Sequence, residues 1–439
     1  MTNSIVFRGR ALVSDAIREV EVRVQDGSIV SVGEGATGAA DVEIELTPNQ
    51  LLMPAAVDGL CAMRDEAEAE RDTVDTVSKA ALASGVGFLA DQANTAPRIN
   101  TGERAHERAR FVAERCLTHY SINAHPPIDI KDLRAYREAG IVSLQAFPWD
   151  VATWNTPRDT DVSSAIYSAW AEAGFETLFF PDELALRETP WRDAGESYAL
   201  QALLRRLPKT LKARLLITQA LSASAIIEAK ERLPNVAIAV APHSLFLSRE
   251  EAFRRIGIGA TQVPPLREQD DVDALAAYAA AGAIDMVVSH HAPHRMGDKY
   301  SEAKIAGEFT PKAGYSAIDL VYPLLMTRLG PELAARLFSE APAKHFGLAK
   351  GRIAKGADAD LIVFQKCASV VDRGVHEGGG ITAGVWKIDP TLFQSKGKVT
   401  PFTGERLDWR AEQTWLAGAL AFDRATMAFN RVSVRQARL

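Results

Sequence analysis

The stretch Val287-Val-Ser-His-His-Ala-Pro-His294 carries a short apolar strand into a turn rich in histidine. Residues 285–289 have the pattern of a buried strand, and residues 271–281 before them have the pattern of a helix. The same alternation recurs upstream, with strand candidates at residues 87–92, 140–147, 176–180, 214–218 and 236–241. Strands and helices alternating at this spacing predict an α/β fold, a parallel (β/α)8 TIM barrel whose function lies at the C-terminal ends of the strands.

One strand–helix unit shows the local signals clearly. Asp72 and Thr73 can cap a helix that places Val74, Val77 and Ala81 on one face, and a glycine at position 85 ends it. Short polar side chains favour the first position of a helix, and glycine favours the position after its end. The pattern therefore predicts a helix that packs one apolar face against the barrel.

The two chain ends have a different character. Residues 4–47 alternate between apolar and polar in the strand manner, with a hairpin turn at Asp26-Gly27, and residues 351–364 read as a turn followed by a buried strand. We expect both ends to build one β-sandwich beside the barrel. The predicted boundaries are 1–53 and 346–420 for the sandwich, 54–345 for the barrel and 421–439 for a C-terminal tail.

The tail has two interpretations. Its aromatic residues Phe422 and Phe429, with Trp415 before them and a basic end, suit an interface with another subunit. The alternative is a terminal helix packed on its own chain.

Composition narrows the class of protein. The chain has 439 residues, of which 47% are hydrophobic and 24% charged, with a net charge of −6. These values suit a globular protein and argue against nucleic acid or an anionic membrane as partner. Three distant cysteines, Cys61, Cys116 and Cys367, predict no disulfide framework, and a chain without long apolar runs or a leader pattern is expected in the cytoplasm.

Several motifs, taken in order, resemble those of one family. They are Ala241-Pro-His-Ser-Leu-Phe-Leu-Ser248, Val263-Pro-Pro-Leu-Arg267, the histidine-rich stretch at 287–294, and Ala341-Pro-Ala-Lys-His-Phe-Gly-Leu348 with the glycine-rich turn that follows. Together they resemble the dihydroorotase branch of the amidohydrolase superfamily over residues 4–420. The resemblance implies a barrel with a β-sandwich domain and, in active members, zinc-dependent hydrolysis of a cyclic amide.

The zinc ligands of that family are mostly missing. The resemblance assigns them to two histidines after the first strand, a lysine or aspartate of the fourth, one histidine each from the fifth and sixth, and an aspartate of the eighth. The residues found at these positions are Leu60, Ala62, Gln145 or Trp149, Phe180, Ala220 and His290, and a shift of one residue would bring in Asp150. Zinc needs three or four nitrogen, oxygen or sulfur donors, so no metal cofactor is expected at the usual positions.

The family's carboxylate-binding residues are partly retained. By the resemblance, Arg64, Asn94 and His294 would bind the carboxylate of a substrate, while Val263 replaces a further asparagine. An arginine fork with an amide and an imidazole suits that task. The alternatives are an ion pair of Arg64 with a nearby acid such as Asp65 or Glu66, and a turn role for Asn94.

Four histidines raise a separate question. His243, His290, His291 and His294 should lie near one another at the ends of strands seven and eight, where they could rebuild a site for zinc. Neighbouring residues of a strand point to opposite sides, so only one of His290 and His291 can face the barrel axis. The alternative is a set of hydrogen-bonded loop histidines. Cys61 is a candidate nucleophile, with a small buried side chain as the alternative.

Two hypotheses of function follow. The first is a non-catalytic scaffold or regulatory subunit, and the resemblance offers aspartate carbamoyltransferase of pyrimidine biosynthesis, or self-association, as its partner. The second is an active cyclic-amide hydrolase or lyase for a carboxylate-bearing substrate, with His290 or His291 as general base. A third possibility is a metal-free binding module, similar to non-catalytic relatives of dihydropyrimidinase. The same sequence features support it as support the first hypothesis, and it differs only in the partner that it would bind.

Overall fold

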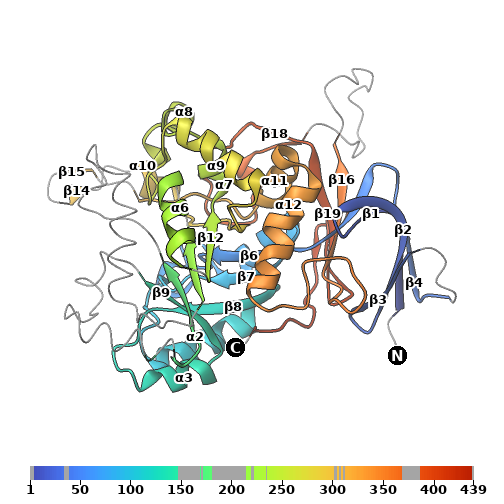
Figure 1. The fold of residues 1–439 in the computed structure, drawn as a ribbon, viewed down its shortest axis with the longest axis horizontal. Helices are drawn as coiled ribbons and strands as arrows, with labels where there is room; N and C mark the ends of the chain where they lie inside the picture. The colour runs from blue at the N-terminus through green and yellow to red at the C-terminus, as the bar shows by residue number, and fades with distance from the viewer. Residues whose placement is uncertain are drawn as a thin grey trace.

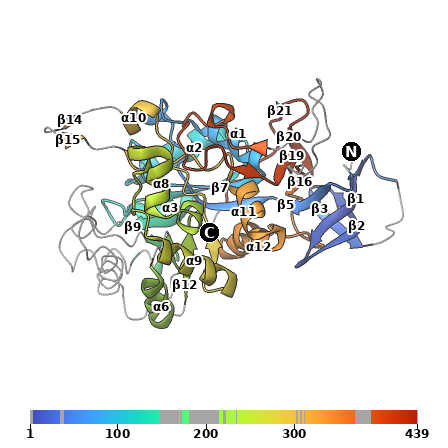
Figure 2. The same ribbon diagram turned by 90° about the horizontal axis from the view of Figure 1, so that it is seen from above.

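The computed structural model describes residues 4–33, 39–146, 169, 172–179, 214–218, 222–233, 235–300, 304–305, 308–309, 312–367 and 386–437. Trp149, Asp150, Phe180 and Ala220, named above for their place in the motif pattern, lie outside these residues. The barrel occupies one end of the molecule, and a sheet made from the two chain ends occupies the other (Figure 1). The view from above shows the same arrangement, with β16 and β19 between the barrel and β1–β3 (Figure 2).

The barrel contains eight parallel strands that neighbour one another in sequence order. They are β6 (Ala56–Cys61), β7 (Val86–Asp91), β8 (His119–Ala124), β9 (Ile141–Ala146), β10 (Glu176–Phe179), β11 (Leu215–Thr218), β12 (Val236–Val240) and β13 (Met286–Val287). A bridge between Cys61 and His291 joins the last strand to the first. The predicted α/β fold class, a (β/α)8 barrel beside a sheet-rich domain from both chain ends, is confirmed, and the strands predicted to form a β-sandwich belong to one nine-stranded sheet.

Helices follow the strands and cover the outside of the barrel. The described helices are α1 (Val74–Ser84), α2 (Gly102–Arg115), α3 (Asp132–Glu138), α6 (Ala223–Arg232), α7 (Pro242–Phe246), α8 (Arg249–Ile256), α9 (Gln269–Ala281), α10 (Met296–Tyr300), α11 (Val321–Leu329), α12 (Pro331–Ala335) and α13 (Ala341–His345). Among the described residues, none of these is long and apolar enough to cross a membrane.

The start and end of α1 agree with the sequence signals. The Thr73 side chain accepts a hydrogen bond from the backbone N–H of Thr76, and Gly85 ends the helix in the left-handed region at φ 89°. A Cβ at Gly85 would lie 1.9 Å from Cδ1 of Ile362 in the β domain. Glycine is therefore required there both for the backbone angle and for the close approach of the two domains.

The chain ends form one continuous sheet of nine strands. The N-terminal end contributes β1 (Ser4–Val13), β2 (Ala16–Gln25), β3 (Ser28–Gly33), β4 (Val42–Glu45) and β5 (Gln50–Pro54), and the C-terminal end contributes β16 (Leu361–Lys366), β19 (Trp409–Leu416), β20 (Ala419–Asp423) and β21 (Ala428–Phe429). The antiparallel pair of β5 and β16 joins the two ends. Small two-stranded pairs elsewhere are β14 (Lys304–Ile305) with β15 (Glu308–Phe309) and β17 (Trp386–Lys387) with β18 (Arg406–Leu407).

The predicted tail packs on its own chain, as strands and extended backbone. β20 crosses the predicted boundary at residue 420, and Phe422 is fully buried with its ring centroid 4.8 Å from that of Phe429. Farther along, the N–H of Tyr120 in β8 donates to Arg435, and the N–H of Ala437 donates to Tyr120. The expectation of a terminal helix was wrong in form, because pairing with β19 and β8 satisfies the backbone of this segment.

The seam between β6 and β13 contains a buried carboxylate. Asp58 is fully buried, and its Oδ1 accepts the backbone N–H groups of Ser289 at 2.8 Å and Leu60 at 3.2 Å. Its Oδ2 is buried without a hydrogen-bond partner among the described residues. Burial raises the pKa of Asp58 to about 6.

The seam carboxylate makes the stability depend on pH. The folded state binds the proton of Asp58 more tightly than the unfolded chain does. Protonation of Asp58 therefore stabilises the fold, and this contribution to the free energy of unfolding is fully present below about pH 4 and is lost as the pH rises through 6. Asp58→Asn keeps the accepting oxygen and removes the buried charge. We expect it to raise the free energy of unfolding at pH 8 by about 2–3 kcal/mol, measured by urea denaturation from pH 4 to 8. The exposed Asp15→Asn is the control, and an equal pH profile in wild type and Asp58→Asn would contradict the assignment.

Candidate functional site

The loop that follows β6 is held in an unusual backbone conformation. Arg64, Asp65 and Glu66 all have positive φ angles, of 54°, 76° and 52°. Three consecutive non-glycine residues in this region are costly, so surrounding contacts must hold them. Such strain concentrates at sites that position functional groups.

A buried ion-pair network supplies those contacts. Arg108 of α2, fully buried, donates to Asp91 Oδ2 at 2.7 Å and to Glu66 at 2.9 Å. The other oxygen of Asp91 accepts the backbone N–H of Met63 at 3.0 Å, and Arg104 donates to Glu66 at 2.5 Å. Met63 at the start of the loop is thus held by Asp91 of β7, and Glu66, the third residue with a positive φ, is held by Arg104 and Arg108 of α2.

Arg64 lies at the barrel mouth with 5% of its surface exposed. Its Nη1 lies 3.3 Å from Glu68, so its acidic partner is Glu68 and not the neighbouring Asp65 or Glu66. The Arg64 Nε is buried without a hydrogen-bond partner among the described residues. Burial lowers the pKa of Arg64, and the nearby Glu68 opposes that shift.

The other two carboxylate-binding candidates also have unused polar atoms. Asn94 is partly buried, and its Oδ1 has no partner within the described part of the chain. His294 donates from Nε2 to the carbonyl of Ala313 at 2.8 Å, which leaves the buried Nδ1 without a partner there. Burial, with the charge of Arg64, lowers the pKa of His294 to about 3.

His243 and His290 form a pair bridged by a glutamine. The Gln262 Nε2 lies 2.7 Å from Nδ1 of His290 and 3.2 Å from Nε2 of His243, and the two rings are 5.5 Å apart. With the amide in this orientation, its NH₂ group donates to both rings, which requires both facing nitrogens to be unprotonated. Burial agrees with this, because it lowers the pKa of His243 to about 3 and that of His290 well below its usual value.

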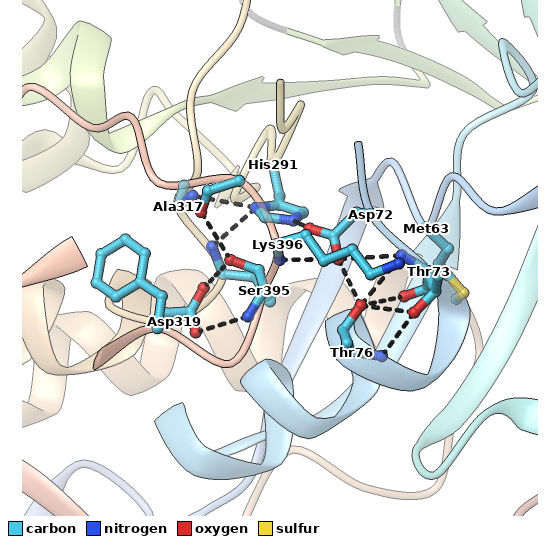
Figure 3. A network of polar contacts seen from close by, with 12 residues as sticks. Met63, Asp72, Thr73, Thr76, His291, Ala317, Asp319, Ser395 and Lys396 are labelled. Carbon is cyan, nitrogen blue, oxygen red and sulfur yellow. Dashed lines mark hydrogen bonds and ion pairs between the residues drawn. The ribbon is translucent and has the colours of Figure 1, made fainter. Parts of the chain in front are cut away.

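His291 lies apart from that pair, between α1 and the turn before α11 (Figure 3). Its Nδ1 accepts the backbone N–H groups of Ala317 at 3.1 Å and Ile318 at 3.3 Å, and its Nε2 lies 3.4 Å from Oδ2 of Asp72. The Nδ1 contacts join the segment after β13 to the turn before α11, while the Nε2, at ion-pair distance from Asp72, makes no hydrogen bond within the described residues. The backbone of His290, at φ 47°, turns its own ring to the other side.

The structure does not bring the four histidines together as one metal site. His243 and His290 face Gln262, His294 faces the carbonyl of Ala313, and His291 faces Asp72. Within the part of the chain that the structure describes, no three histidine, cysteine or acidic side chains are placed to hold a metal ion.

The family's metal positions in the described residues do not fit zinc. Leu60 is fully buried in an apolar cluster with Leu178, Leu216 and Val288, and Ala62 is also fully buried. Gln145 uses its Oε1 to accept the backbone N–H of Ala93 at 2.9 Å. Aliphatic side chains cannot donate to a metal, and one glutamine oxygen already in use cannot replace the set.

Cys61 lies on the outer side of β6. It is fully buried in the apolar layer between strands and helices, and burial raises the pKa of its thiol well above the usual value. A thiol that resists ionisation is a poor nucleophile.

Two residues at the site carry no motif signal. Gln262 was visible only as the residue before the Val263-Pro-Pro-Leu-Arg267 stretch. Lys299 is fully buried, and its Nζ donates to the carbonyls of Thr261 and Gly314, each at 2.8 Å, with the ring of Tyr315 centred 5.0 Å away. Burial lowers the pKa of Lys299 to about 7. Only the folded arrangement brings these two residues beside His243.

Comparisons with known proteins agree with this architecture. The amidohydrolase family model matches residues 218–399. A dihydroorotase of Bacillus cereus (strain G9842) is 25% identical over 453 residues, covering 96% of this chain and 99% of that protein. A dihydroorotase of Anaplasma phagocytophilum (strain HZ) is 26% identical over 410 residues, covering 88% and 86%.

Solved structures of hydantoinases have the same fold. The L-hydantoinase (dihydropyrimidinase) from Arthrobacter aurescens superposes with a TM-score of 0.85 at 19% identity, covering 100% of both chains. A D-hydantoinase (dihydropyrimidinase) from Thermus sp. gives 0.83 at 19% identity, covering 99% of this chain and 98% of that one. The resemblance to the dihydroorotase-like branch of the amidohydrolases is confirmed.

The bridged histidine pair gives a direct test of the site's electrostatics. We expect neither His243 nor His290 to titrate between pH 5 and 8 in histidine NMR spectra, because burial keeps both rings neutral. Gln262→Glu would place a carboxylate between the rings and raise both pKa values by about 1–3 units. A wild-type titration of either ring above pH 6 would contradict this geometry.

Proposed function

We propose that this chain is a non-hydrolytic dihydroorotase-like protein that binds a small carboxylate-bearing ligand at the barrel mouth and acts as a scaffold or regulatory subunit. The observation that carries the proposal is the apolar filling of the first-strand positions. Leu60 and Ala62 are fully buried where active relatives need metal-binding histidines. These side chains supply no means of activating water.

The remaining polar groups do not supply a substitute. A metal in such sites lowers the pKa of water and polarises the scissile carbonyl, and hydrolysis of an amide is slow without both effects. A general base works best with a pKa near the working pH. Burial holds the pKa values of His243 and His290 far below neutrality, so both are weak bases. The Nδ1 of His291 already accepts the backbone N–H groups of Ala317 and Ile318, so its lone pair is not available to a substrate proton.

The ligand-binding half of the site supports the second part of the proposal. Arg64 Nε is a buried donor with no partner within the described residues and can donate to a ligand carboxylate, whereas Asn94 Oδ1 and His294 Nδ1 are buried acceptors without a partner there and can receive N–H groups of the same ligand. Buried polar atoms without partners are rare, and those at a barrel mouth suit a ligand. Arg64 is buried there with 5% of its surface exposed, and its charge favours an anion.

The second candidate is an active cyclic-amide hydrolase or lyase with a rebuilt histidine-based site. The observation that favours it is the strained backbone of His290, at φ 47°, beside His243. Strain of this kind accompanies active sites as well as ligand clamps. This candidate requires a base with a higher pKa than burial allows in the unliganded geometry.

Activity and binding assays separate the two candidates. With dihydroorotate as probe and zinc, manganese or cobalt supplied in turn, we expect no hydrolysis above the buffer rate and measurable binding by calorimetry. Arg64→Gln should weaken binding about ten- to hundredfold, the usual effect of losing a charged hydrogen bond. Arg134→Gln, which changes an exposed arginine of α3, should bind as wild type does.

Each contrary result has a distinct meaning. Turnover abolished by a chelator would show a metal-dependent hydrolase and overturn the proposal. Turnover that survives the chelator and is lost in His290→Ala would establish the second candidate. Unchanged affinity in Arg64→Gln would remove the proposed carboxylate site.

For the scaffold role we propose aspartate carbamoyltransferase as the partner, following the family resemblance, with self-association as the alternative. Co-expression of this chain with the carbamoyltransferase of the same organism should give one complex of defined stoichiometry in size-exclusion chromatography with light scattering. We expect the complex to persist in Arg64→Gln, because a scaffold does not need the ligand site. Separate elution of the two proteins would contradict this partner.

A further inference from the structure

Three side-chain amides lie at the ends of three successive barrel strands. Gln92 follows β7, Asn123 belongs to β8 and Gln145 to β9. Asn123 and Gln145 are fully buried, and Gln92 is 2% exposed. None of the three takes part in the carboxylate site or in the histidine pair described above.

Strand alternation directs these amides to the inside of the barrel. Ile122 and Ala124 both belong to the apolar layer under the helices, so Asn123 between them faces inward. Asp91 points outward to Arg108, so Gln92 lies on the inner side. The Gln145 side chain reaches across β8, because its Oε1 accepts the N–H of Ala93, the residue after Gln92.

The inward-facing amides have unused hydrogen-bonding atoms. Gln92 Nε2, Gln145 Nε2 and both polar atoms of Asn123 are buried and have no partner within the described part of the chain, as does the hydroxyl of Ser121 two residues earlier on β8. An unpaired buried polar group costs about 1–3 kcal/mol. A cluster of such atoms in the middle of a barrel is therefore expected to have a bound partner.

We propose that Gln92, Asn123 and Gln145 form an uncharged cradle that binds the amide, urea or imide group of a ligand. The two NH₂ groups of Gln92 and Gln145 can donate to carbonyl oxygens. Asn123 offers both a donor and an acceptor, which matches the C=O and N–H of one amide edge. The cradle contains no charged side chain, so it suits a neutral group better than an ion.

The cradle complements the cationic mouth. It rests on the proposed function, since the same ligand would place its carboxylate at Arg64 and its neutral amide group at the cradle. A site with both parts would bind a ligand that has a carboxylate and an amide group more tightly than a ligand that has the carboxylate alone. Selection of this kind is strong when the mismatched ligand leaves buried polar atoms unpaired.

A pair of carboxylic acids tests the selection. Dihydroorotate has a six-membered ring with a ureide and a carboxylate, and cyclohexanecarboxylate has the same ring size and the carboxylate without the ureide. We expect calorimetry to show binding of dihydroorotate at least about tenfold tighter in the wild type. Asn123→Leu should remove this preference while leaving the affinity for cyclohexanecarboxylate unchanged.

The same variant has a stability readout that does not depend on a ligand. Asn123→Leu replaces an unpaired buried amide with an apolar group of similar size, so we expect the melting temperature of the free protein to rise. Asn100→Leu makes the same chemical change at a half-buried position before α2 and should alter neither the melting temperature nor the selectivity by a comparable amount. A gain in stability with a loss of selectivity distinguishes a binding residue from a packing residue.

The outcomes separate failure of the cradle from failure of the proposed function. If Asn123→Leu lowers the affinity for both acids equally, or for neither, the cradle is overturned. The carboxylate site still stands in that case if Arg64→Gln weakens the binding of both acids. If the wild type binds neither acid, both proposals fall. If dihydroorotate is hydrolysed, the proposed function falls, and the cradle stands only if Asn123→Leu raises KM about tenfold or more. A crystal structure with dihydroorotate elsewhere and only ordered water on the three amides also overturns it.

Discussion

The seam between β6 and β13 determines where the candidate site residues lie. Asp58 fastens the two strands by accepting the N–H of Ser289, and the N–H of Ala62 donates to the carbonyl of His291 at 2.8 Å. The chain leaves one side of this seam as the loop that contains Arg64. It leaves the other side through His290, which has a positive φ, and His291, whose Nδ1 accepts the backbone N–H groups at 317–318. The seam carboxylate, with its raised pKa, thus remains buried despite its cost because both halves of the mouth depend on it.

Much of the fold follows from local patterns. The caps of α1, the Asp26-Gly27 turn between β2 and β3, and the strand–helix alternation each have a local physical cause and agree with the structure. The tail does not follow the prediction, although Ala417 and Gly418, with φ of 45° and 73°, form the turn of a hairpin there. Its two phenylalanines pack across β20 and β21, so sheet pairing outweighs any helical preference of the segment.

The candidate site is less accessible to sequence reasoning, because its contacts join distant segments. The motif positions of Arg64, Asn94 and His294 could be read from the sequence, but the partner of Arg64 could not, since Glu68 is one of several nearby acids. Lys299 and Gln262 carry no pattern of their own, and they matter because folding brings them beside His243. The same is true of Asn123, whose significance lies in its burial without a partner among the residues that the structure describes.

The proposed anionic ligand has to be compatible with the negative net charge of the chain. Near the mouth, the acids are already paired: Asp91 and Glu66 with Arg108, Glu68 with Arg64 and Arg71, and Asp72 with the start of α1. A divalent cation requires carboxylates or imidazoles that face it, whereas these carboxylates hold the strained loop in place. The Arg64 Nε and amide atoms of Gln92, Asn123 and Gln145 are buried without hydrogen-bond partners within the described residues. These atoms are the basis of the proposed ligand, which is anionic at one end and neutral at the other.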